Sequence, residues 1–417
     1  MRCAVEGNSG GVWPKAKIVH WFIDHLSFIG PVGPDAKKMI PIRYNLRSLI
    51  VRHVGTIMTV LGVALTVAVF VSVLAMVRGL ESTFVDSGEP LNLILIRQSS
   101  QAETNSFFDR DIKPTVETTE GVTTVAGEII VLINQPRLTG ETANVIVRGV
   151  SDKSLELRPR VKLVEGRMFR PGLREVAVSR SIANRFKDAK LGDNIKIGRS
   201  MWNVVGILDA AHTAYDSEIW GDYNEISGEF ERPIYSSLLV RCADEASLVA
   251  VRDKLANDRK IRLDVFRQRE YFEAQTGSAL PIKVLGYLIA AIMAVGSSFA
   301  VMNTMYAATA YRTREIATLR VLGFKRRNIL FSFMLESLLL ALVGGVLGCL
   351  LALPVNGIST GTFNMNTFSE IVFDFRVTPR LMLEGIIFAA VMGTLGGFLP
   401  ARLAARLTIV RALRTEV

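Results

Sequence analysis

The chain has 417 residues, of which 49% are hydrophobic and 21% charged, and its formal net charge is +10. This composition excludes a disordered chain, and three cysteines are too few for a disulfide-stapled small domain. It indicates membrane-spanning segments joined to a water-facing part. Binding of nucleic acid would require the positive residues to form one patch, so their positions along the chain decide that question.

Residues 1–38 differ from the rest of the chain. Their apolar run is interrupted by His and Asp and is a poor signal-peptide core. Met39 opens a basic lead into the first long apolar stretch, so we expect the natural start at Met39 and interpret the leader as a translation-start artefact. The alternative is a cytoplasmic extension that lies on the membrane surface with Trp13, Trp21 and Phe22 at the interface.

Four apolar stretches are long enough to cross a bilayer, which takes roughly 20 residues. The first two contain no charge, the third contains Glu336, and the fourth contains Glu384 near its start. A large polar region separates the first stretch from the second, and a shorter polar, turn-prone link separates the third from the fourth. The sequence therefore predicts one spanning helix, a large domain and three further spanning helices, with the spans at 54–77, 284–311, 329–355 and 381–401.

The basic residues gather in three segments next to the spans. Segment 39–53 has three arginines and no acid, segment 312–327 has six basic residues against Glu315, and the tail has four arginines against Glu416. Loops rich in Lys and Arg stay in the cytoplasm. We therefore expect a multi-pass protein of the inner (plasma) membrane, with both termini cytoplasmic and the large domain outside. The positive charge reflects this topology and contact with the lipid membrane, so no nucleic-acid partner is expected.

The large domain, expected at 79–280, has short β-type runs separated by turn residues and is predicted to be an α+β domain with two lobes. Helical patterns are present at 180–186 and 244–257. The predicted strands are 91–97, 128–133, 143–150, 174–179, 194–198, 202–209 and 233–242.

The segment 209–225 is the richest in polar side chains that could bind a metal. It contains His212, Asp216, Glu218 and Asp222, but their spacing matches no standard site, and a solvated loop is the preferred interpretation. The sequence has no GxxxxGK[ST] phosphate loop and no recognisable catalytic arrangement. We therefore predict no metal, no bound cofactor and no enzymatic activity of this chain by itself.

The residues 268–315 have the pattern of one long helix that continues into the second span. At 1.5 Å per residue such a helix is about 65 Å long, enough to cross the bilayer and support the large domain. Two helices with a hinge at Pro281 are the alternative. The basic segment that follows the second span predicts a short amphipathic helix at 312–324. Its small apolar stripe consists of Ile316, Leu319, Val321 and Leu322, and Gly323 is expected to end the helix.

Three stretches carry a resemblance to a known family. They are NTMYAATAYRTREIATLRVLGFKRRNILFSFMLESLLLALVGGVLG at 303–348, the ending GTLGGFLPARLAARLTIVRALR at 393–414, and the domain pattern VRGV, LVEGRMF, REVAVS, LGDNIKIG and WNVVGI. Together they resemble the MacB/FtsX-like permeases of ABC systems, the type VII or mechanotransmission group. The resemblance covers roughly 40–417 and implies a MacB-like periplasmic core domain followed by an FtsX-like domain at 281–417.

The resemblance implies a permease subunit that dimerises with a second copy or a paralogue and binds a separate ABC ATPase subunit. ATP and Mg would be bound by that ATPase. The MacB exporter carries its ATPase fused at the N-terminus, and this chain departs from that pattern, because we find no ATPase sequence before the first span. The residues expected in the ATPase-coupling helix are Arg312, Arg314, Glu315, Ile316, Leu319, Arg320, Leu322 and Gly323.

Two further sets of residues inside the spans are singled out. Small residues four apart permit close approach of helices within the chain or in a dimer; they include Gly296, Gly344, Gly348, Gly393 and Gly397. Glu336 is the unusual intramembrane acid, and we expect it to pair with Arg402 or Arg406 in a structural role, with proton or substrate coupling as the alternative.

The function predicted from the sequence is transmission of ATP-driven motion across the membrane to the outside domain, for export. Export would add a periplasmic adaptor protein and an outer-membrane channel as partners. A lipoprotein-releasing or cell-wall-hydrolase-regulating subunit of the same family is the first alternative. A membrane receptor with an outside sensor domain and no ATPase is the alternative from another class.

Overall fold

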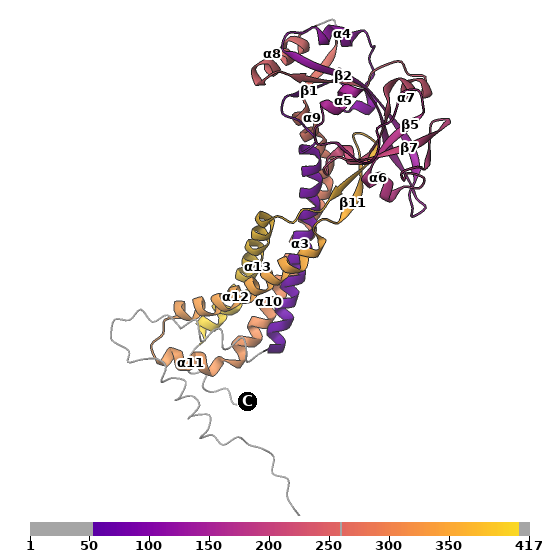
Figure 1. Cartoon of the computed structure of the whole chain (residues 1–417). Helices are drawn as coiled ribbons and strands as arrows, with labels where there is room; N and C mark the ends of the chain where they lie inside the picture. Colours follow the sequence, from indigo (N-terminus) through magenta and orange to yellow (C-terminus); the bar gives the residue numbers. More distant parts are fainter. Residues whose placement is uncertain (1–52, 259–260, 408–417) are drawn as a thin grey trace, which may run out of the picture.

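The computed structural model describes residues 53–258 and 261–407. It is elongated, with an α+β domain at one end and a bundle of long helices at the other (Figure 1). The leader 1–38, the basic lead up to Arg52, and the tail residues Arg411 and Arg414 lie outside the described residues.

Four helices are long and apolar enough to cross a membrane, as predicted. They are α3 (His53–Val85), α10 (Leu280–Tyr311), α12 (Arg326–Ala352) and α13 (Pro379–Arg406). α3 continues beyond the expected end of the span, and its last two turns bury Leu80 and Phe84 in the α+β domain. Lys283 of α10 pairs with Glu81 of α3 at 3.1 Å, so α3 and α10 together form a two-helix stalk under the domain.

Glycines allow the helices of the bundle to pack closely. A Cβ at Gly344 or Gly348 of α12 would collide with α3, and a Cβ at Gly393 or Gly397 of α13 would collide with α12. These four glycines therefore serve contacts within one chain. Gly296 of α10 differs, because a Cβ there would meet nothing within 4 Å.

The expected single helix over 268–315 is wrong, and the alternative with a break near Pro281 describes the chain better. α9 (Gln268–Gln275) is followed by a 3₁₀ turn, η3 (Thr276–Ala279), and then by α10. Pro281 has no backbone N–H to donate to an earlier turn, so it is tolerated at the start of a helix and not in its interior. A second break, at Arg312, separates α10 from α11 (Thr313–Val321).

The α+β domain is built on a ten-stranded sheet. Its order is β10-β1-β9-β2-β3-β8-β5-β7-β4, and β6 pairs with β7. The pairs β3–β8 and β5–β7 are parallel and the others are antiparallel. The strands are β1 (Asn92–Arg97), β2 (Val122–Pro136), β3 (Thr142–Val150), β4 (Lys162–Gly166), β5 (Glu175–Ser179), β6 (Asn194–Ile197), β7 (Ser200–Asp209), β8 (Glu218–Asp222), β9 (Ser237–Cys242) and β10 (Leu263–Arg267).

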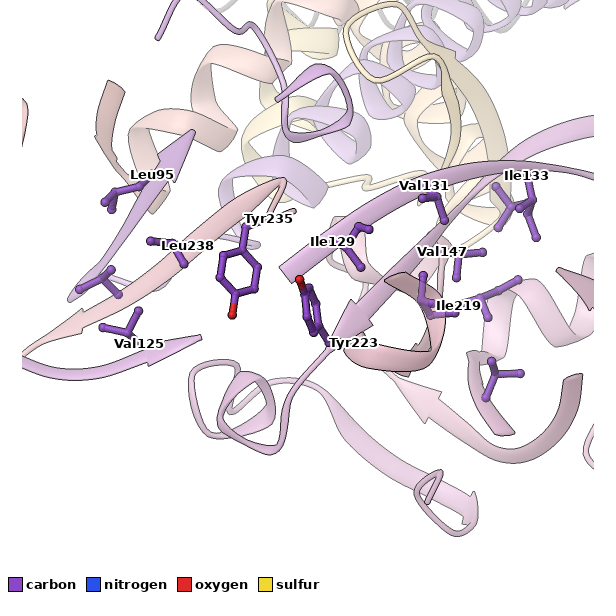
Figure 2. Packing of buried hydrophobic residues seen from close by; sticks show 14 of the residues in the cluster. Leu95, Val125, Ile129, Val131, Ile133, Val147, Ile219, Tyr223, Tyr235 and Leu238 are labelled. Carbon is purple, nitrogen blue, oxygen red and sulfur yellow. The ribbon is translucent and has the colours of Figure 1, made fainter. Parts of the chain in front are cut away.

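The strand β2 belongs to both lobes of the domain. Its first half pairs with β9 and its second half, from Ile129, pairs with β3. Figure 2 shows the apolar core continuing along this strand, from Val125 to Ile133. A Cβ at Gly127 would collide with the ring of Tyr235, so a glycine is needed where the core passes from one lobe to the other. The predicted two-lobed α+β domain is present.

Short helices complete the domain. The predicted helices at 180–186 and 244–257 are α6 (Arg180–Arg185) and α8 (Glu245–Ala256), and all seven predicted strands are present. The strands β4, β8 and β10 were not predicted. The remaining elements are η1 (Glu103–Asn105), α4 (Ile112–Glu117), α5 (Asp152–Glu156), η2 (Ala214–Ser217) and α7 (Tyr223–Glu229) in the domain, and η4 (Leu353–Val355), β11 (Ser359–Asn364) and β12 (Ser369–Asp374) between α12 and α13.

A cluster of five buried charges lies in the centre of the domain. Arg148 of β3 donates hydrogen bonds to Glu218 at 2.7 Å, to Glu128 at 2.8 Å and to Glu103 at 3.0 Å. Arg158 binds Glu128 at 2.5 Å and 2.7 Å. Burial alone would raise the pKa of Glu128, but the two arginines outweigh it and lower that pKa to about 2. The ion pairs of this cluster therefore hold β2, β3, β8 and η1 together.

The four residues considered as metal ligands have separate roles, and the solvated loop expected for them is wrong. Glu218 belongs to the charge cluster, and Asp222 accepts hydrogen bonds from the N–H groups of Asn224 and Glu225 and caps α7. Asp216 is buried, which raises its pKa to about 6, and His212 lies 2.5 Å from Asp374. Within residues 53–258 and 261–407 no group of three His, Cys, Asp or Glu side chains could hold a metal ion.

Replacing Arg148 with methionine is expected to destabilise the domain by about 3–5 kcal/mol, because it leaves buried carboxylates without their counter-charge. The full chain in detergent should then unfold at a temperature lower by at least about 6 °C. Tryptophan fluorescence can follow the transition, since Trp220 donates to Glu218 in the cluster. Arg199→Met is the control: Arg199 is 89% exposed, so its loss should be nearly neutral. Equal melting temperatures for both variants would contradict the assigned role.

Candidate coupling segment

The helix α11 lies at the end of the bundle farthest from the α+β domain (Figure 1). Arg312 interrupts the path from α10 into α11, with φ −100° and ψ 13°. At the other end Gly323 has φ +88°, a left-handed conformation that glycine adopts without strain. The break and the glycine bound a short helix in the position that the sequence predicted for the amphipathic segment.

Arg312, which follows α10, contacts both α11 and α12 through its guanidinium group. The side chain is 9% exposed; Nη1 donates to Oε2 of Glu336 in α12 at 2.9 Å, and Nε donates to Oε2 of Glu315 in α11 at 3.0 Å. The guanidinium carbon also lies 5.2 Å from the ring centroid of Phe333. A buried pair of opposite charges holds its two elements firmly, because the apolar surroundings cannot replace the contact once it is broken. The positions of α11 and α12 are thereby linked.

The expected partner of Glu336 was wrong. Arg402 and Arg406 are exposed on α13, whereas the side chain of Glu336 is 4% exposed and is paired with Arg312. The break between α10 and α11 explains the difference, because it directs Arg312 into the bundle. Arg312 also pairs with Glu315, at 3.0 Å.

The other predicted coupling residues are divided between two sides of α11. Ile316 is 1% exposed and packs in the bundle core with Ile329 and Phe333. Val321 and Leu322 are 64% and 46% exposed, so the predicted apolar stripe is only partly buried. Arg314 and Gly323 are exposed, Leu319 and Arg320 are half-buried, and Arg320 donates to the carbonyl of Phe324 at 3.3 Å.

Replacing Glu336 with alanine should loosen α11 from α12, because it removes the carboxylate of α12 that the buried Arg312 binds. Loss of one member of a buried pair costs about 3–5 kcal/mol. Amide hydrogen exchange in 313–321 should therefore become at least about tenfold faster. Glu384→Ala is a matched control, since Glu384 is 35% exposed and its cationic partners lie at 3.6 Å and 3.8 Å. Unchanged exchange in the Glu336 variant would show that the pair does not hold α11.

Both parts of the chain match family models. Residues 56–258 match the MacB-like periplasmic core domain, and residues 287–409 match the FtsX-like permease C-terminal model. Over 390 residues the chain is 24% identical to a macrolide export ATP-binding/permease protein, MacB, of Hahella chejuensis, covering 87% of this chain and 58% of that protein. It is 26% identical over 404 residues to an uncharacterized ABC transporter permease, YknZ, of Bacillus subtilis, covering 90% of this chain and 98% of that protein.

The chain therefore spans less than two thirds of the MacB protein and almost all of the YknZ permease. A crystal structure of the extracellular domain of a YknZ transporter from Gram-positive bacteria is also similar. It covers 42% of this chain and 99% of its own, with 17% identity and a TM-score of 0.34. With two family models matched in this order and four helices able to cross a membrane, the chain is a multi-pass membrane protein and belongs to the MacB/FtsX-like permease family of ABC systems.

Proposed function

We propose that this chain is the permease subunit of an ABC transporter, and that a separate ATPase subunit docks on α11. The observation that carries the proposal is the position of α11. It is joined to α12 through Arg312 and Glu336, and α10 runs from it to the base of the α+β domain. A displacement of α11 at one end of the molecule therefore has a direct mechanical path to the other end.

The exposed side of α11 suits a protein partner. Val321 and Leu322 expose apolar surface beside the exposed, basic Arg314. An apolar patch with a charged rim is typical of a docking surface. ATP and Mg would be bound by the partner, and we assign no catalytic or cofactor site to this chain. The almost full coverage of the YknZ permease supports a subunit of this kind.

The basic residues around α11 support the orientation of the chain. Six of the seven charged residues in segment 312–327 are positive. Under the positive-inside rule this end, with both termini, lies in the cytoplasm, and the α+β domain lies outside the inner membrane.

The free face of α10 supports assembly with a second permease, either another copy or a paralogue. Leu285, Ile292 and Phe299 are 56%, 64% and 59% exposed on this helix, and Gly296 has open space at its Cβ position. ATP-driven closure of two ATPase subunits would then change the separation of two α11 helices and move the two outside domains. Coupling of this kind requires two states that the nucleotide favours differently.

Export is the transport role we favour, because MacB of Hahella chejuensis is named as a macrolide export protein. Export would bring in a periplasmic adaptor protein and an outer-membrane channel. Release of lipoproteins and regulation of cell-wall hydrolases are the alternatives within the family.

Purification of the tagged full chain in mild detergent tests the proposal. An ABC ATPase should co-purify with the chain and hydrolyse ATP. The double variant Val321→Lys, Leu322→Lys should lower the recovered ATPase at least about tenfold, because it places two charges in the docking surface. Leu173→Lys, Met201→Lys is the matched control, since both residues are 56% exposed but lie in the α+β domain.

The possible failures of this experiment are distinct. Absence of any ATPase from the folded normal chain would sink the permease proposal and favour the receptor alternative. Full retention of the ATPase by the Val321, Leu322 variant would leave the permease proposal in place and remove α11 as the docking site.

A further inference from the structure

The link between α12 and α13 is a β-hairpin that leaves the bundle and packs on the α+β domain (Figure 1). β11 and β12 pair antiparallel from Ser359 with Asp374 to Asn364 with Ser369. Ile371 and Phe373 of β12 are buried in one apolar cluster with Phe84 of α3 and Trp220 of β8. The hairpin thus forms part of the core at the base of the domain.

Glu370 is the central polar contact of the hairpin with the domain. This glutamate is 5% exposed and lies between two arginines of the domain. Arg137, which follows β2, donates to Oε2 at 2.5 Å and 3.1 Å, and Arg185 at the end of α6 pairs with the other oxygen. A Cβ at Gly361 of β11 would collide with Glu370 and Arg185, so the glycine makes room for the pairing.

Further contacts fix the hairpin along its length. The backbone N–H of Val372 donates to Ser217 Oγ at 2.8 Å, and Asp374 lies 2.5 Å from His212 Nδ1. Asn144 donates to the carbonyl of Phe368 at 3.0 Å, near the turn. Beyond β12, Arg376 pairs with Asp86 at 3.1 Å, just after the end of α3. Contacts therefore run from the turn of the hairpin to its base.

Three connections now join the domain to the membrane helices: α3, the path from α9 through η3 into α10, and the hairpin. The stalk helices α3 and α10 lie side by side and are paired at Glu81 and Lys283. The hairpin adds a third attachment, through Arg137 after β2 and Arg185 of α6. The hairpin also begins where α12 ends, and α12 is the helix that Arg312 holds to α11.

We propose that Glu370 is a positioning residue that locks the α+β domain to the hairpin, so that movement of α12 reaches the domain through the hairpin as well as through the stalk. The locking is a property of this chain alone, whereas the transmission of movement rests on the proposed function. A single buried carboxylate suits this role. It accepts charge-assisted hydrogen bonds from Arg137, which are stronger and geometrically more specific than neutral ones, and it forms an ion pair with Arg185.

Hydrogen exchange of the full chain in detergent tests the locking, with Glu370→Gln as the variant. The amide keeps the size of the side chain but loses its charge. Exchange in 359–374 should become at least about tenfold faster. Glu141→Gln is the control, because Glu141 also contacts Arg137, at 3.5 Å, but is 76% exposed. Gly361→Ala is a second variant: its methyl group on β11 would push Glu370 and Arg185 apart. It should therefore have the same effect on exchange as Glu370→Gln.

The transmission is tested on the same variants with the ATPase bound. Addition of ATP should change exchange in the α+β domain of the normal chain and of Glu141→Gln. This change should be smaller in Glu370→Gln, although the ATPase is still bound, because only the stalk then transmits the movement. The locking would be overturned if both Glu370→Gln and Gly361→Ala had amide exchange rates in 359–374 within twofold of the normal chain. A full ATP response in Glu370→Gln would overturn the transmission. Absence of a bound ATPase from every sample would instead refute the proposed function. The locking would still be decided by hydrogen exchange of the chain without a partner.

Discussion

Arg312 and Glu336 form an ion pair inside the helical bundle, and this pair ties the break between α10 and α11 to α12. Its two side chains are 9% and 4% exposed, so water cannot readily replace the contact if the pair is broken. This makes the junction stiff in a region where apolar side chains alone would permit sliding. The same rule governs the centre of the α+β domain, where Arg148 and Arg158 hold three buried glutamates. In both places buried charge fixes the relative position of elements that are distant in the sequence.

A continuous series of contacts leads from α11 to the α+β domain by two routes. One follows α10 into η3 and α9 at the base of the domain. The other passes from Arg312 to Glu336 in α12 and then through β11 and β12 to Glu370, which Arg137 and Arg185 hold. Helices and paired strands transmit displacement because their backbone hydrogen bonds resist stretching, and the two routes meet on one rigid sheet. In the proposed mechanism a domain held in this way moves with its own membrane helices, and the relative motion takes place at the contact with the second permease.

The spans, the two-lobed domain and the short helix at 313–321 could be predicted from the sequence, because each depends on local pattern. Apolar runs of sufficient length mark α3, α10, α12 and α13, short β-type runs between turn residues mark strands such as β3 and β7, and Gly323 marks the end of α11. Gly344, Gly348, Gly393 and Gly397 were found by their spacing, although the spacing could not distinguish contacts within one chain from contacts in a dimer.

The rest of the structure depends on contacts between distant segments. β8 was missed because its residues Glu218, Trp220 and Asp222 look like part of a solvated loop until Arg148 is placed beside Glu218. The hairpin was read only as a polar, turn-prone link, since Glu370 makes sense only opposite Arg137 and Arg185. The partner of Glu336 was misassigned because the break at Arg312 turns this side chain into the bundle, and no local pattern signals that direction. One sign was available: Arg312 is the first charged residue after an uncharged span.

In the proposed mechanism, one chain moves as a single body from α11 to the α+β domain. The most direct measurement is to determine the structure of the assembled complex with its ATPase twice, once without nucleotide and once with ATP trapped. We predict that α11, α12, the hairpin and the domain of one permease superimpose between the two states, with the contact between Glu370 and the two arginines intact, while the two permeases shift relative to each other. A domain that rotates on the stalk with this contact broken would contradict the account.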